Sequence, residues 1–179
     1  MRPGRRKMSR NIIVNILRFV VLIFIQVFLL KNVALYNLSA PYIYILFIML
    51  LPFDIPNWML FPIAFFTGLT IDVFYDTPGL NALATVAMAF VRILFISITV
   101  QKEGFDNEPE PTLSIMGFRW FFTYTLVLTL VHHFILFAVE SFNLSGIKYA
   151  IGRFLFSSVF TIILILISGL IFFRRKERK

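Results

Sequence analysis

Cysteine is absent from this chain of 179 residues. That absence excludes disulfides, thiol chemistry and cysteine-based metal sites. Charge is also scarce, because only 15% of the residues are Asp, Glu, Lys or Arg, against about 25% in soluble domains. The acids are outnumbered by the bases, 9 to 17. No polar stretch is long enough to form a separate soluble domain.

Hydrophobic residues are what the chain has in excess: they make up 59% of it and include 23 Phe. Soluble domains hold about 45–50% apolar residues, so a soluble fold could not easily bury this surplus. About 20 apolar residues span a bilayer as a helix, and six such spans would use about 120 residues. We therefore expect an all-α membrane protein with six transmembrane helices in a compact bundle.

The apolar runs predict helices at 12–30, 40–51, 58–74, 80–100, 116–139 and 147–173. The first run is longer than the apolar region of a signal peptide, about 7–15 residues, so we interpret it as a retained helix. The prediction is one transmembrane domain, 12–173, between two basic tails, 1–11 and 174–179. Within it, residues 101–115 form an acidic, proline-containing loop.

Basic residues set the expected topology, because each of the two tails carries five of the 17 Lys and Arg. Positive charge beside apolar runs favours the cytoplasmic side. Both termini are therefore expected in the cytoplasm, which requires an even number of spans and places the loop 101–115 there too. Such charge suits contact with anionic lipids rather than with nucleic acid.

The stretch from Gly68 to Ala84 gathers small, acidic and turn-forming residues between two long apolar runs. Spacings of three and four residues place small and polar side chains along one side of each flanking helix, where another helix can approach closely. Proline and glycine between the helices predict a tight turn. The candidate structural or partner-contact residues are Ala64, Gly68, Asp72, Pro78, Gly79, Asn81, Thr85 and Arg92.

Asp72 is an ionisable residue in or near a span, and such residues usually face a bundle interior or a partner. It either organises this hairpin, by bonding Asn81, Thr85 or a turn amide, or is wetted at the outer surface. Arg92 lies about 12 residues into the next helix, roughly 18 Å from the turn at about 1.5 Å per residue, too deep for a direct bond to Asp72. Arg92 is expected to snorkel toward the cytoplasm or to pair within the bundle.

His132 and His133 are adjacent, so their side chains point about 100° apart on a helix and are poorly placed to share a metal. We expect an outer-leaflet polar contact for them and no metal or cofactor site. Glu140 and Arg153 flank the last helix link and could form an ion pair there. No nucleophile elbow, phosphate loop or zinc-binding His-Glu motif is present, which argues against an enzyme. The Phe-rich faces fit lipid contact, core packing or a partner's helix.

The hairpin resembles the signature of the MreD family, the rod shape-determining membrane proteins of bacteria. The segments Gly68-Leu-Thr-Ile-Asp72 and Pro78-Gly-Leu-Asn-Ala-Leu83 carry this resemblance. The size, the basic start and the six expected spans are similar to that family over nearly the whole chain. The resemblance implies a multi-pass protein of the bacterial inner membrane, similar in fold to the substrate-binding S-components of energy-coupling-factor transporters.

The same resemblance implies a non-enzymatic scaffold of the cell-elongation machinery for peptidoglycan. The implied partners are MreC, through its transmembrane helix, and also RodA, a class B penicillin-binding protein and the MreB filament. The similarity to S-components supplies the competing hypothesis, a transporter subunit that binds a small, vitamin-like molecule. Asp72, Asn81, His132, His133 and Arg153 are the outward-facing polar residues that could line its pocket.

Overall fold

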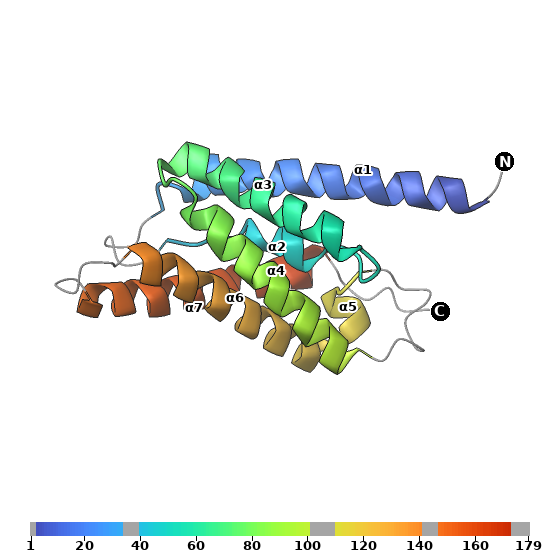
Figure 1. The fold of residues 1–179 in the computed structure, drawn as a ribbon. Coiled ribbons are helices and arrows are strands. Elements are labelled where there is room, and N and C mark those ends of the chain that lie inside the picture. Colours follow the sequence, from blue (N-terminus) through green and yellow to red (C-terminus); the bar gives the residue numbers. More distant parts are fainter. Residues whose placement is uncertain (1–2, 34–39, 101–109, 141–146, 173–179) are drawn as a thin grey trace.

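The computed structural model describes residues 3–33, 40–100, 110–140 and 147–172, and every regular element in these ranges is a helix. The elements are α1 (Pro3–Phe24), its π-helical continuation η1 (Ile25–Leu30), α2 (Ile45–Met49), α3 (Asn57–Tyr75), α4 (Leu80–Thr99), α5 (Leu113–Met116), α6 (Phe118–Glu140) and α7 (Ile147–Phe172). The long helices run along one another (Figure 1).

Five of these helices, α1 with η1, α3, α4, α6 and α7, are long and apolar enough to cross a membrane. The chain is thus an all-helical protein with the elements of a multi-pass membrane protein. We call the end where α1 begins the near end. The α3–α4 turn, the C-terminal end of α6 and the N-terminal end of α7 lie at the opposite end, which we call the far end (Figure 1).

Two expected helix boundaries were wrong. The predicted helix at 40–51 is reduced to Ile45–Met49, because residues 40–44 are non-helical and only the five that follow form an α-helix. The first helix begins at Pro3 rather than at residue 12, so the described part of the basic tail is helical, while the apolar span within this helix and its continuation is Ile12–Leu30 as predicted. The last residues of the expected loop 101–115 include the short α5. Residues 101–109, the link 141–146 and the tail 174–179 lie outside the described residues.

The α3–α4 hairpin is built by its turn residues. Asp76 ends α3 in the left-handed conformation, with φ of 54°, and its amide donates to the Asp72 carbonyl. Gly79 precedes α4 with φ of 81°, a conformation that glycine adopts without steric strain. Two left-handed residues so close together reverse the chain in a few residues, and α4 packs back along α3 (Figure 1).

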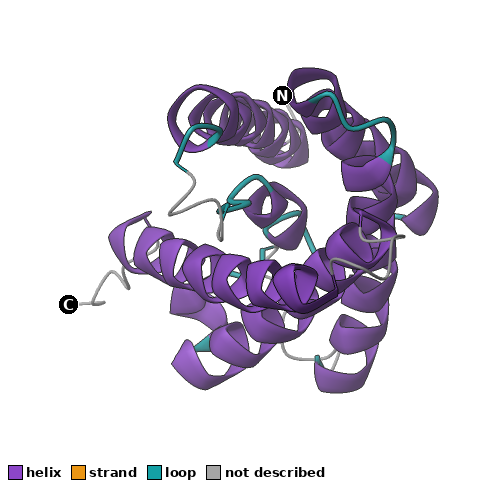
Figure 2. Cartoon of the chain, turned by 90° about the vertical axis from the view of Figure 1, so that its left-hand side faces the viewer, coloured by secondary structure: helices purple, strands orange, loops and turns teal. Residues whose placement is uncertain are grey.

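Residues 40–51, which contain α2, form the centre of the molecule, and we call them the central segment. Every residue from 41 to 51 is buried. Viewed from one end, the short helix lies inside the ring made by the long ones (Figure 2). In a membrane, non-helical backbone is tolerated only where protein or a water-filled cavity surrounds it. Residues 40–44 meet that condition because the long helices surround them.

Candidate functional site

Gly68 is where α3 and α4 come closest. A Cβ atom added there would lie 2.5 Å from the Ala82 Cα, 2.5 Å from the Asn81 carbonyl oxygen and 2.6 Å from the Ala82 nitrogen. These are backbone atoms, which cannot swing aside as a flexible side chain can. Ala64, one turn earlier on α3, is fully buried. The two helices thus pack backbone against backbone, the close approach that small residues permit in membranes.

One turn beyond Gly68, the Asp72 carboxylate caps the N-terminus of α4. Its Oδ1 accepts hydrogen bonds from the Asn81 amide (2.9 Å), the Asn81 side-chain Nδ2 (3.0 Å) and the Thr77 hydroxyl (2.7 Å). Its Oδ2 accepts from the Ala82 amide at 2.9 Å. First-turn amides have no partner within their own helix, and a negative charge there also suits the helix dipole. Asp72 is 4% exposed, and its carboxylate holds the two helices of the hairpin together.

Tyr44 connects this hairpin to the rest of the bundle. Its hydroxyl lies 2.7 Å from His132 Nε2 on α6, 3.0 Å from the Thr85 hydroxyl and 3.3 Å from Asn81 Oδ1 on α4. The Thr85 hydroxyl donates to the Asn81 carbonyl at 2.6 Å, so it accepts from Tyr44. One buried phenol therefore joins the central segment, α4 and α6.

Hydrogen-bond partners assign the tautomers of the two histidines. His133 Nδ1 lies 2.9 Å from the Thr129 carbonyl, an acceptor only, so Nδ1 carries the proton. His133 Nε2 then accepts from the Thr161 hydroxyl at 3.2 Å. His132 Nδ1 lies 3.4 Å from that protonated Nδ1, which requires His132 to carry its proton on Nε2 and to donate to Tyr44.

The histidines make the polar contacts expected of them, and their position in the outer leaflet stays a prediction. Both residues are fully buried in the bundle interior, and their ring nitrogens approach each other although the residues are neighbours in sequence. Each ring is a neutral hydrogen-bonding link between helices. Within the described residues, no group of three or more His, Asp or Glu is placed to hold a metal ion.

The non-helical residues 40–44 obtain their hydrogen bonds from side chains of two other helices. On α7, Ser157 Oγ accepts from the Ala40 amide and Thr161 Oγ1 from the Tyr42 amide, both at 3.0 Å. Gln26, in the π-helical turn η1, donates to the Pro41 carbonyl at 2.9 Å and accepts from the Tyr44 amide at 3.4 Å. Three side chains thereby take the place of the missing helical hydrogen bonds.

Two arginines cap the other end of the central segment. Arg92 donates to the Leu51 and Pro52 carbonyls, and Arg18 donates to the Leu50 carbonyl at 3.2 Å and to Glu110 at 2.9 Å. A helix C-terminus leaves carbonyls without internal partners and favours positive charge. Arg92 is only 2% exposed. It pairs within the bundle, and the alternative of snorkelling to the surface is wrong.

The structure brings together five of the candidate residues at the α3–α4 interface: Ala64, Gly68, Asp72, Asn81 and Thr85. Pro78 and Gly79 form the turn beyond them, at the far end of the bundle. Arg92 is separate from them, at the end of the central segment. Glu140 and Arg153 form their own ion pair, 2.7 Å apart, at the far end of α6 and α7.

Sequence reasoning missed the residues that serve the central segment: Gln26, Tyr44, Ser157 and Thr161. Gln26 does carry a signal, because it is an amide far inside the apolar run 12–30 and a polar side chain at that depth needs a partner. The others carry none. Hydroxyls are common in apolar helices, where they can bond to their own backbone.

No protein-family model matches the sequence, and no curated protein or solved structure matches it either.

Proposed function

We propose that this chain is a non-enzymatic scaffold of the bacterial cell-elongation machinery, of the MreD type, in the inner membrane. One observation carries the proposal. The residues with which the hairpin resembles that family, Gly68, Asp72 and Asn81, are the same residues that make the closest helix contact and the buried helix cap. The motif thus has a physical task, which is to fix α3 against α4.

An interior whose polar groups bond to one another supports a scaffold better than a transporter subunit. A vitamin pocket needs several hydrogen-bonding groups that converge on a ligand. Asp72, Asn81 and His132 are buried and bonded to groups of the protein itself, so their bonding capacity is already used. The apolar outer faces of the long helices remain for contact with lipid or with a partner's transmembrane helix, for which we propose MreC.

We propose that the central segment is the sixth crossing of the membrane. Its first three residues, 40–42, have neither turn nor helix and cover up to about 10 Å, and the nine turn, helical or bend residues 43–51 at about 1.5 Å each add about 14 Å. The total, roughly 25 Å, approaches the ~30 Å hydrocarbon core. Six crossings put both basic tails on one side, the cytoplasmic side by their charge. There they would meet anionic lipid and lie close to MreB, RodA and the penicillin-binding protein.

Topology is tested with an epitope tag at each terminus of the intact protein in spheroplasts. Both tags should resist labelling until the membrane is permeabilised. If one tag is labelled from outside, the six-crossing proposal is wrong.

Association is tested by co-expressing the chain with the MreC encoded in the same genome and capturing one through the other in a mild detergent. We expect a stable complex with the native chain and with Gly152→Ala, because an added Cβ at Gly152 meets nothing within 4 Å. Gly68→Ala should reduce the yield of complex. No complex with the native chain, or a stoichiometric small molecule in the purified protein, would count against the scaffold.

A further inference from the structure

A groove of about 460 Å³ lies between α6 and α7 toward the far end of the bundle, within the ~300–1,000 Å³ range of ligand sites. Its lining is apolar and includes Phe134, Phe137 and Ala138 from α6 and Ala150, Ile151 and Phe154 from α7. Phe134 and Ile151 are 61% and 53% exposed, so the groove is open on the outside of the bundle. Alanine, a small side chain, occurs in this lining on both helices.

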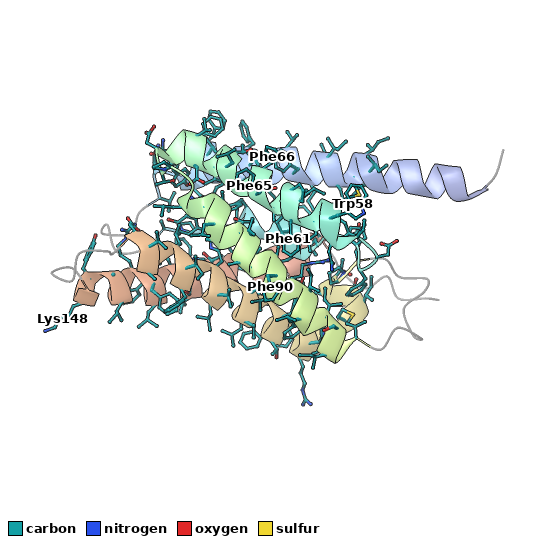
Figure 3. All side chains as sticks on the ribbon, viewed as in Figure 1. Trp58, Phe61, Phe65, Phe66, Phe90 and Lys148 are labelled. Atoms are coloured by element: carbon teal, nitrogen blue, oxygen red, sulfur yellow. The ribbon has the colours of Figure 1, made fainter. Side chains whose placement is uncertain are left out.

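The groove has one charged end. Arg153 pairs with Glu140 at 2.7 Å, and its guanidinium lies 5.0 Å from the ring centre of Phe137, a lining residue. Lys148 is exposed at the start of α7 and points away from the bundle (Figure 3). No other Asp, Glu, Lys or Arg occurs between Glu140 and Arg153 in the sequence. This end of the hairpin therefore has one positive charge more than its carboxylate neutralises.

We propose that the groove binds one anionic phospholipid, with an acyl chain against Ala138 and Ala150 and its phosphate beside Lys148 and Arg153. A phospholipid joins hydrocarbon chains to one charged headgroup, which matches an apolar groove with a basic end. Basic residues beside transmembrane helices are known to hold lipid headgroups. The site needs only a membrane around the bundle and does not depend on the scaffold proposal.

The shape of the groove argues against a partner helix as its occupant. From Phe134 to Ala138 the lining covers four residue steps, and from Ala150 to Leu155 five, about 6–8 Å along the helices at ~1.5 Å per residue. A transmembrane helix of about 20 residues packs along some 30 Å of its neighbours. A groove that is short along the helix axis, and charged at one end, fits a flexible chain anchored by a headgroup.

The test is native mass spectrometry of the full chain in detergent, titrated separately with phosphatidylglycerol and phosphatidylcholine. We expect one lipid per chain, with phosphatidylglycerol bound roughly fivefold more tightly because one unpaired Lys contributes about that much. Ala150→Phe fills the groove and should abolish the bound lipid, as should the smaller Ala138→Leu. Ala87→Phe, on a partly exposed face of α4, is the matched control and should retain it.

Lys148→Gln tests the headgroup contact separately, because an exposed lysine can be changed without disturbing the packing. This variant should bind both lipids equally. If Ala150→Phe and Ala138→Leu keep the lipid that the native chain holds, the groove is not the site. If the native chain is a dimer and Ala150→Phe makes it monomeric, a second copy of the chain occupies the groove. If the native chain binds the two lipids equally, the proposed contact between the headgroup and Lys148 is wrong.

Discussion

Gly68→Ala adds a single methyl group at the closest contact between α3 and α4. The new Cβ would lie 2.5 Å from two backbone atoms of α4, whereas carbon atoms pack best about 3.5–4.0 Å apart. No side chain can move to make room, so the helices must separate by about 1 Å. Asp72 lies one turn along α3, and its bonds to the Asn81 and Ala82 amides, both 2.9 Å, would be stretched beyond hydrogen-bonding distance.

Three effects determine the size of the change. Overpacking costs about 1–3 kcal/mol, and two lost interhelical hydrogen bonds remove about 0.6–1.7 kcal/mol each in a membrane. Against these, replacing glycine by alanine in a helix stabilises by up to about 1 kcal/mol. Gly152→Ala, also in a helix, has this gain without a clash. Because the gain cancels between the two variants, Gly68→Ala should be less stable than Gly152→Ala by about 3 kcal/mol.

Thermal unfolding in one detergent, followed by circular dichroism, measures this difference. About 3 kcal/mol corresponds to roughly 6–12 °C in Tm for a chain of this size. We expect Gly152→Ala at or slightly above the native Tm and Gly68→Ala well below it. If the two variants melt within a degree or two of each other, α3 and α4 do not touch at Gly68 as described.

Three further substitutions test the central segment by the same measurement. Tyr44→Phe leaves the His132 N–H without its acceptor and should destabilise by about 1–3 kcal/mol; an unchanged Tm would show that Tyr44 is not the link between helices. Thr161→Val removes the acceptor of the Tyr42 amide and should cost a similar amount. Thr70→Val, whose hydroxyl bonds only within its own helix, should be nearly neutral, and equal losses in the two would refute the cross-bundle bond. Arg92→Met leaves the buried Leu51 carbonyl without its donor and removes one of two donors to the partly buried Pro52 carbonyl; it should destabilise by about 1–3 kcal/mol, and a rise in Tm would contradict the capping role.

Much of the fold could be predicted because its signals are local. The hairpin was expected at 58–74 and 80–100 and is found at Asn57–Tyr75 and Leu80–Thr99, because turn residues and a small-residue stripe mark it within the sequence. Asp72 and Asn81 are only nine residues apart, so a tight turn is enough to bring them together. The last two long helices were likewise predicted to within two residues at each end.

The central segment could not be predicted because its determinants are distant. A run that is buried on every side shows no periodic face, so a short helix with a non-helical start cannot be told from a longer helix. The Ala40 and Tyr42 amides are satisfied by residues 117 and 119 positions away. For the same reason the partners of the histidines were not predicted: Tyr44 and Thr161 are distant from them in sequence.

The hydrogen bonds from Ser157 and Thr161 to residues 40–44 bear on how the chain is made. Residues 40 and 42 are synthesised more than a hundred residues before these two hydroxyls. Until α7 inserts, the backbone of residues 40–42 must be hydrated or helical, so the mature core can assemble only after α7 has been made. A nascent chain that stops before α7 would lack these acceptors and would leave the Ala40 and Tyr42 amides without these partners.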